Sequence, residues 1–109
     1  MARITFSGRP APRPDRSKGS LVRRTFSIVN KLGLHARAAA QLVKLAEQFT
    51  SEVKIGKDDQ VVNGKSIMGL MMLAASRGSS IDVEATGDDA AAMLDAIGEL
   101  IANRFNEAE

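Results

Sequence analysis

His35 is the only histidine of this sequence and the side chain best suited to covalent chemistry, and Arg37 follows two positions later. A neutral imidazole is a nucleophile near pH 7 that needs no separate base, so it can accept a phosphoryl group. An arginine offers planar N–H donors that match phosphate oxygens. A lone histidine is more often a structural residue, but this spacing indicates phosphate chemistry, with His35 as the acceptor and Arg37 as the group that holds the phosphate.

The segments that flank His35 are a predicted strand and a predicted helix. Residues 24–30 read as a strand that places Phe26 and Ile28 on one face. Residues 34–49 carry apolar side chains at helical spacing. The helical set is Ala39, Leu42, Val43, Ala46 and Phe49. Because the first N–H groups of a helix lack partners and carry the positive end of its dipole, a phosphate would be held at the start of this helix.

A second informative segment begins at Ser66, the predicted N-cap of a short helix that ends near Ala75. This segment is apolar on nearly every side. The stripe assigned to the core is Leu70, Leu73 and Ala74. The stripe on a different face is Ile67, Met68 and Met71. A leftover apolar face rich in methionine is typical of a surface that docks partner proteins, while burial of both faces is the competing interpretation.

The remaining pattern predicts three more strands and a last helix. The strands cover 52–56, 60–63 and 81–85, and a turn at 57–59 joins the first two. The last helix begins near 88–89. Its predicted buried stripe is Leu94, Ile97, Ile101 and Phe105. The order is β-α-β-β-α-β-α, so we expect an α+β fold, an open-faced β-sandwich with a four-stranded antiparallel sheet and three helices on one face.

Composition limits the classes of function. The chain has 109 residues, 44% of them apolar and 26% charged, which is typical of one globular domain. It has no cysteine, which excludes disulfides and thiolate sites, and a single histidine argues against a protein-built metal site. We expect no metal and no cofactor. No apolar stretch approaches the ~20 residues of a membrane span, and the start lacks the apolar core of a signal peptide. We therefore expect a cytoplasmic protein without membrane insertion.

The first 24 residues are strongly basic, with seven Lys or Arg side chains against Asp15 alone. Their balance of +6 leaves a body of −4, since the whole chain carries +2. All three prolines lie within 10–14, so we predict that residues 1–21 form a disordered basic extension. A passive extension is favoured over a nucleic-acid-binding arm because Phe6 is its one aromatic residue for stacking. A translation start near residues 21–22 is a third interpretation.

Three motifs carry a family resemblance. They are Asn-Lys-Leu-Gly-Leu-His-Ala-Arg at 30–37, Gly-Lys-Ser-Ile-Met-Gly-Leu at 64–70 and Ile-Asp-Val-Glu-Ala-Thr-Gly at 81–87. Together they resemble the histidine-containing phosphocarrier proteins of the bacterial phosphoenolpyruvate-dependent phosphotransferase system, HPr and its nitrogen-regulatory paralogue. The resemblance covers about residues 22–106, and we assign 22–109 to an HPr-like domain. The first and third motifs resemble the nitrogen-regulatory branch and the second resembles the kinase-regulated carriers, so both branches stay open.

The resemblance implies a phosphocarrier, a component of a phosphotransferase system rather than a free-standing enzyme. It would accept a phosphoryl group from phospho-Enzyme I and pass it to an Enzyme IIA-type protein, in sugar uptake or in nitrogen and carbon regulation. His35 would carry the phosphate on Nδ1, with Arg37 beside it. Ser66 would align with the serine that HPr serine kinase/phosphorylase modifies in some bacteria. The partner-docking patch would include Ile67, Met68 and Met71. We expect a monomer that does not bind nucleic acid.

One position departs from the family pattern. Many members have a proline after the arginine, where this chain has Ala38. Proline suits the first turn of a helix, but alanine is an excellent helix former, so we expect the helix to persist. The alternative from a different class is a binding module that keeps the fold, leaves His35 idle and uses the Met-rich helix or the basic tail to contact a regulator.

Overall fold

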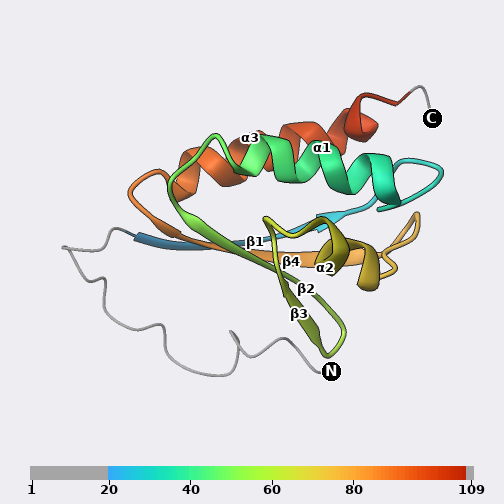
Figure 1. The fold of residues 1–109 in the computed structure, drawn as a ribbon, viewed down its shortest axis with the longest axis horizontal. Helices are drawn as coiled ribbons and strands as arrows, with labels where there is room; N and C mark the ends of the chain where they lie inside the picture. The colour runs from blue at the N-terminus through green and yellow to red at the C-terminus, as the bar shows by residue number, and fades with distance from the viewer. Residues whose placement is uncertain (1–19, 108–109) are drawn as a thin grey trace.

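The sheet at the centre of the structure, a computed structural model that describes residues 20–107, has four antiparallel strands in the order β1-β4-β2-β3 (Figure 1). The strands are β1 (Ser20–Ser27), β2 (Glu52–Lys57), β3 (Gln60–Asn63) and β4 (Ser80–Gly87). The helices are α1 (Ala36–Ala46), α2 (Ile67–Met72) and α3 (Ala90–Ala102), followed by the 3-10 turn η1 (Arg104–Asn106). This is the predicted α+β fold, an open-faced β-sandwich.

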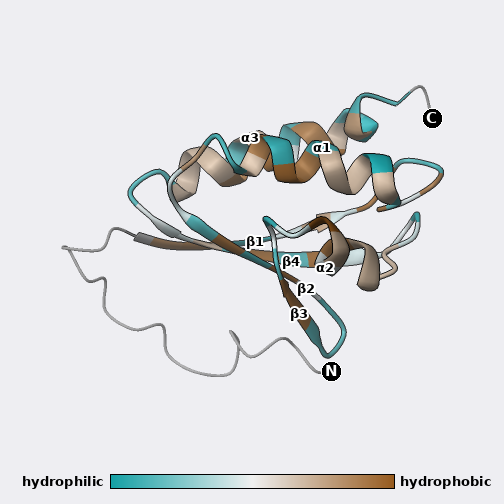
Figure 2. Ribbon diagram, in the orientation of Figure 1, coloured by the Kyte–Doolittle hydropathy of each residue, from teal (hydrophilic) through white to brown (hydrophobic). Residues whose placement is uncertain are grey.

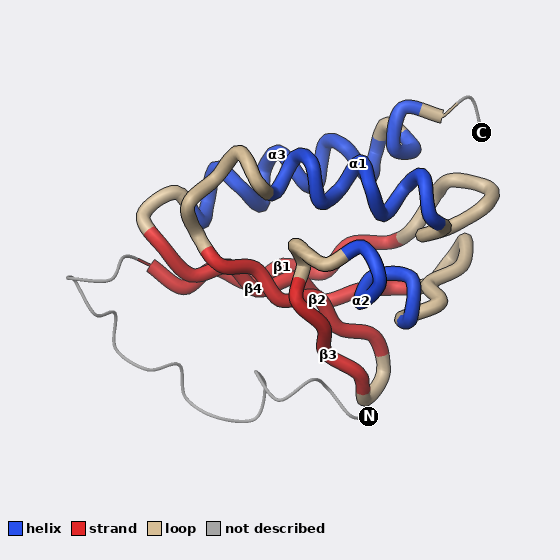
Figure 3. Tube along the Cα trace, viewed as in Figure 1, coloured by secondary structure: helices blue, strands red, loops and turns tan. Residues whose placement is uncertain are grey.

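One face of the sheet packs on the helices and forms the core. Because successive strand residues point to opposite faces, β4 buries Ile81, Val83 and Ala85 completely and leaves the residues between them more exposed. Val53 and Ile55 of β2 are buried on the same layer. Hydrophilic residues gather at the tip of the β2–β3 hairpin, away from this core (Figure 2). The short α2 contacts both α1 and β3 (Figure 3).

The first strand begins and ends earlier than the predicted 24–30. It starts at Ser20 because it pairs with β4 along its whole length. It ends before Ile28, whose N–H donates to the Ser79 carbonyl at 2.8 Å outside the ladder. Ser20 and Leu21 therefore belong to the sheet, although the predicted extension includes them. The rest of that extension, residues 1–19, lies outside the described residues.

The other strands lie where the sequence predicts them, with slightly longer ends. The second strand runs on to Lys57, and the hairpin turn is then Asp58-Asp59, with Asp58 in the left-handed region at φ 56°. The strand predicted at 81–85 runs from Ser80 to Gly87 because it is central and has a partner on each side.

The first helix is shorter than the predicted 34–49, and its core residues are as predicted. It ends at Ala46, because the N–H of Gln48 bonds to Leu45 O and that of Phe49 to Ala46 O. These are i to i+3 hydrogen bonds, which close tight turns rather than continue an α-helix. The predicted set that is buried comprises Ala39, Leu42, Val43 and Ala46. Phe49 is half-buried and lies beyond the helix.

The second helix also ends early, at Met72 rather than near Ala75. Leu70 and Leu73 are buried as predicted. The prediction that Ala74 joins them in the core is wrong, because its backbone turns into the left-handed region at φ 53° and its methyl group is exposed. The buried residue at this end is Ala75 instead.

The last helix buries its predicted stripe but does not contain all of it. Leu94, Ile97 and Ile101 are buried within α3. Phe105 is also buried, at 1% exposure, but it lies in η1, so its predicted place in the helix is wrong. The three residues of η1 have φ values of 57°, 54° and 65°, all left-handed. This turn carries the chain away from the axis of α3 and brings Glu107 to the start of α1.

Candidate functional site

His35 is the N-cap residue of α1, which confirms its predicted position at the start of a helix. Its backbone is extended, with φ −84° and ψ −176°. Its carbonyl accepts the first helical hydrogen bond from Ala39 N at 2.8 Å. Its Nδ1 accepts a hydrogen bond from Arg37 N at 3.3 Å, so the imidazole caps the helix as a Ser or Asp side chain would.

The loop before His35 is held by the segment that follows α2. Gly33 has φ +70°, and a Cβ at this position would lie 2.5 Å from the Ala75 carbonyl oxygen. The next residue, Leu34, donates its N–H to the same oxygen at 2.8 Å. A glycine is required here because of both the left-handed backbone and the close approach. The position of His35 therefore depends on contacts with a distant part of the chain.

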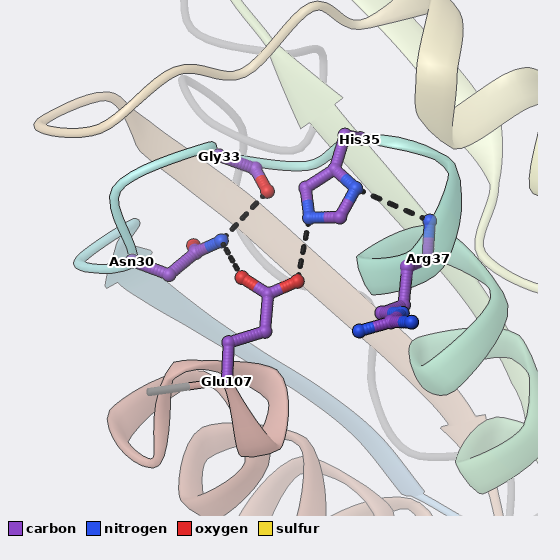
Figure 4. A network of polar contacts seen from close by, with 5 residues as sticks. All are labelled: Asn30, Gly33, His35, Arg37 and Glu107. Carbon is purple, nitrogen blue, oxygen red and sulfur yellow. Dashed lines mark hydrogen bonds and ion pairs between the residues drawn. The ribbon is translucent and has the colours of Figure 1, made fainter. Parts of the chain in front are cut away.

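A carboxylate and an amide complete the surroundings of the imidazole (Figure 4). Oε2 of Glu107 lies 2.5 Å from Nε2 of His35. Its other oxygen, Oε1, accepts a hydrogen bond from Nδ2 of Asn30 at 3.0 Å, and Nδ2 also donates to the Gly33 carbonyl at 2.8 Å. Asn30 is fully buried. Two segments far apart in the sequence, the loop at 30–35 and the C-terminal turn, therefore meet at one ring.

The charges of this network favour an ionised carboxylate. Burial raises the pKa of Glu107, but hydrogen bonds from Asn30 and His35, together with the charges of His35 and Arg37, outweigh burial and leave the pKa below its ordinary value. The ionised carboxylate of Glu107 can only accept a hydrogen bond, so Nε2 of His35 is the donor to it. The backbone N–H of Arg37 donates to Nδ1, which is therefore the acceptor. In this arrangement a neutral ring carries its proton on Nε2 and its lone pair on Nδ1.

The site opens into a shallow depression of about 720 Å³. Its lining is Lys31, Leu32, His35, Ala36, Arg37, Asn106 and Glu107. The side chain of His35 is 30% exposed, so a group carried by another protein can reach it. Over residues 20–107, no three His, Cys, Asp or Glu side chains are grouped so that they could hold a metal ion. No helix in that part of the chain is long and apolar enough to span a membrane.

Ser66 caps α2 as predicted, because its Oγ accepts a hydrogen bond from Gly69 N at 3.0 Å. The apolar side chains beyond it are exposed, so the competing interpretation, in which both faces of α2 are buried, is wrong. The predicted patch is exposed by 41% at Ile67, 72% at Met68 and 45% at Met71. Met72, at the end of the same helix, is 66% exposed and was not predicted, and Leu32, in the lining of the depression at His35, is 67% exposed.

Two residues of the site also escape the sequence analysis. Asn30 lies inside the first motif, but nothing in the motif indicates that its amide supports a carboxylate. Glu107 is 72 positions from His35, and no local pattern links the two. The left-handed turn at 104–106 is what joins them, and it consists of residues without the glycine that would have signalled it.

The fold and the site together define a class of protein, the small phosphoryl carriers with an open-faced β-sandwich. The family model described as "PTS HPr component phosphorylation site" matches residues 22–103. The chain belongs to this family, the HPr phosphocarriers of the phosphotransferase system.

Relatives and solved structures agree with this assignment. The chain is 51% identical to the phosphocarrier protein HPr of Cupriavidus necator over 89 residues, covering 82% of this chain and all of that protein. It is 49% identical to HPr of Neisseria meningitidis over the same length, covering 82% of this chain and 100% of that protein. The structure of HPr-C-His from Thermoanaerobacter tengcongensis superposes with a TM-score of 0.77 at 42% identity, covering 81% of this chain and 99% of the other. HPr from Bacillus anthracis gives a TM-score of 0.73 at 38% identity, covering 76% and 99%.

Proposed function

We propose that His35 is the residue that carries the phosphoryl group, which it receives from phospho-Enzyme I and passes to an Enzyme IIA-type protein, in sugar uptake or in nitrogen and carbon regulation. The observation that carries this proposal is the position of Nδ1, whose lone pair meets the first turn of α1 while Nε2 is bonded to Glu107. Unpaired N–H groups and the positive end of the helix dipole stabilise an anion at this position.

The reaction exchanges one P–N bond for another. The lone pair of His35 Nδ1 forms the new bond as the donor's P–N bond breaks, and that electron pair returns to the donor nitrogen. Arg37 supplies positive charge and planar donors for the phosphoryl oxygens. Because a phosphoramidate is labile, the group can then move to a histidine or cysteine of the acceptor, provided that the site does not bind it too tightly.

The exposed face of α2 is the proposed docking patch, with Ile67, Met68 and Met71 at its centre. Leu34 and Gly33 of the histidine loop contact the segment after α2, so the loop that carries the imidazole is joined directly to the end of this helix. Flexible methionine side chains adapt to partners of different shape, and a carrier must bind a donor and an acceptor in turn.

Ser66 is the proposed regulatory residue, modified by an HPr serine kinase/phosphorylase where one is present. A phosphate on its Oγ would add about −1.5 to −2 charges at the start of α2. That charge would suit the helix dipole but would stand directly beside the apolar docking patch, where it disfavours an acidic partner. We further propose that the protein works as a monomer in the cytoplasm and that residues 1–19 are a passive extension rather than a nucleic-acid-binding arm.

The test is incubation of the full chain with phosphoenolpyruvate and Enzyme I. We expect a single phosphate, stable in base and lost in acid, that His35→Ala abolishes and that is delivered to a IIA-type acceptor. Absence of any such phosphate with a competent Enzyme I would overturn the carrier role and leave the binding module as the better account.

A further inference from the structure

We propose that Glu107 is a positioning residue for phosphoryl transfer: its carboxylate keeps the proton of His35 on Nε2, presents Nδ1 as the nucleophile and balances the charge that the ring gains. This inference rests on the proposed role of His35. It adds a residue from the C-terminal segment, outside all three motifs that identify the family.

The geometry gives Glu107 a defined orientation. One carboxylate oxygen lies 2.5 Å from Nε2, while the other accepts from the buried amide of Asn30 at 3.0 Å. Glu107 itself is only 14% exposed. A carboxylate held at both oxygens cannot swing away as a surface glutamate does, so the imidazole has a fixed partner (Figure 4).

The backbone before Glu107 also supports a positioning role for this residue. All three residues before Glu107 adopt left-handed φ values, which are rare outside glycine and unfavourable for Arg104 and Phe105. Phe105 is buried at 1% exposure and anchors this turn on the core. The turn contacts α3 and α1, and it delivers the carboxylate to the ring rather than letting the chain run on along α3.

The charge changes during transfer show why a carboxylate is useful here. The neutral ring attacks through Nδ1 and retains its proton on Nε2, so the new N-phosphoryl ring carries positive charge when the donor's P–N bond has broken. No proton needs to leave. Glu107 stabilises that positive charge through the Nε2–H bond, as the buried carboxylate does for the histidine of a serine protease. The same bond keeps the ring protonated for delivery, and a protonated ring is the better leaving group.

The first measurement requires no Enzyme I. In the full-length unphosphorylated chain labelled with 15N in histidine, NMR should show the ring proton on Nε2 and a slowly exchanging Nε2–H signal. Glu107→Ala should abolish the slow exchange. The matched control is Glu99→Ala, an exposed glutamate of α3, which should leave the signal unchanged.

The second measurement is the rate of transfer from phospho-Enzyme I to the full chain. Glu107→Gln retains the shape and an accepting oxygen but removes the charge, so we expect transfer about tenfold slower, with the thermal unfolding midpoint unchanged. Glu99→Gln should transfer at the wild-type rate.

The outcomes separate this inference from the function on which it rests. A wild-type chain that accepts no phosphate would overturn the proposed function, and this inference with it. A wild-type chain that transfers, together with a Glu107→Gln variant that transfers equally fast, would overturn the positioning role alone. A slow Glu107→Gln variant with unchanged unfolding, together with loss of the slow Nε2–H exchange in Glu107→Ala, would support it.

Discussion

The imidazole of His35 has a different partner at each of its two nitrogens. These partners favour the proton on Nε2 and the lone pair on Nδ1. Nε2 faces a carboxylate that is anionic at neutral pH, and Nδ1 faces the backbone N–H of Arg37. A free histidine would exchange its proton between the two nitrogens. In this site the polar neighbours select one tautomer before any donor arrives, which is preorganisation in its simplest form.

The guanidinium of Arg37 lies at the first turn of α1, beside the proposed site of the phosphoryl group. Arg37→Ala should slow transfer about 10- to 100-fold, because a charge-assisted hydrogen bond to the phosphoryl oxygens is lost. The backbone N–H of residue 37, which donates to Nδ1 of His35, is retained in this variant. Arg37→Lys should recover part of the rate, since it keeps the charge but not the planar fork. The measurement is stopped-flow or rapid-quench transfer from phospho-Enzyme I. Lys44→Ala, an exposed residue of the same helix, is the control, and equal rates for it and Arg37→Ala would contradict this role.

Ser66 is the N-cap of α2 and lies next to the exposed docking patch. Ser66→Asp should slow transfer to and from protein partners, because it adds a negative charge beside the docking patch, while the fold persists since aspartate is also a good N-cap. Ser27→Asp, which adds the same charge on the exposed side of β1, should transfer normally. Transfer at the wild-type rate by Ser66→Asp with every partner would exclude this serine as a regulatory site.

Among the elements, the histidine loop depends on Gly33. This glycine can be compared with Gly78, which also has a positive φ but lies in open surroundings. Gly33 and Gly78 both have positive φ, but a Cβ at Gly33 would meet backbone atoms at 2.5 and 2.9 Å, whereas a Cβ at Gly78 would meet nothing within 4 Å. Gly78→Ala should therefore cost about 1–2 kcal/mol of unfolding free energy from the left-handed backbone alone.

Gly33→Ala should cost clearly more than Gly78→Ala and should also slow transfer, because its clash displaces the loop that positions His35. Chemical denaturation measures the first effect and phosphorylation by Enzyme I the second. If the two variants lost the same stability and transferred equally well, the support of the loop by the segment after α2 would be wrong.

The carboxylate of Asp89, at the start of α3, is expected to make the stability of the fold depend on pH in acid. This carboxylate accepts the N–H groups of Thr50 and Ser51 at 2.9 Å each, together with both hydroxyls, and so fastens the start of β2 to the start of α3. The Ser51 hydroxyl and the Thr50 N–H are the main causes that lower the pKa of Asp89 to about 2. Because the folded pKa lies below the ordinary 3.8, this carboxylate stabilises the fold above about pH 4, and the stabilisation is lost as the pH falls toward 2.

The variant Asp89→Asn should therefore be less stable than wild type at pH 6, and the difference should shrink between pH 4 and pH 2. Thermal unfolding midpoints measured over this range test the prediction. Asp88→Asn removes the same charge from an exposed neighbour and should show no such convergence. A constant gap between Asp89→Asn and wild type down to pH 2 would show that the carboxylate does not act in this way.

The sequence predicts those features of the fold and site that depend on local patterns. The start of α1 at His35, the Ser66 cap and the inward residues of β4 all follow from neighbours a few positions away. The early end of α2 could not be predicted, because Ala74 is an ordinary alanine in a left-handed backbone that the surrounding packing imposes. The contact between Glu107 and His35 could not be predicted for the same kind of reason, since tertiary packing of Phe105 sets it.

In the whole molecule, the fully buried core of residues 20–107 runs from Ile28 to Phe105, and the partly buried Val22 and Phe26 of β1 pack against it. The open side of the sheet carries mostly polar strand residues, and the site lies at the end of α1 nearest the C-terminal turn (Figure 1).

If the basic extension is passive, as we propose, deletion of residues 1–19 should leave the unfolding midpoint and the rate of transfer unchanged, because the contacts that fix His35 in the structure come from residues within 20–107. Differential scanning calorimetry and the transfer assay measure the two effects. A marked loss of transfer with unchanged stability would assign the basic extension a role in binding a partner.

The identity of the phosphorylated atom tests the proposed role of His35 directly. After the full chain, labelled with 15N in histidine, is incubated with phosphoenolpyruvate and Enzyme I, NMR detects which ring nitrogen couples to phosphorus. We expect coupling to Nδ1 of His35, with the proton retained on Nε2. Coupling to Nε2, or a phosphate that persists in His35→Ala, would contradict the proposed role.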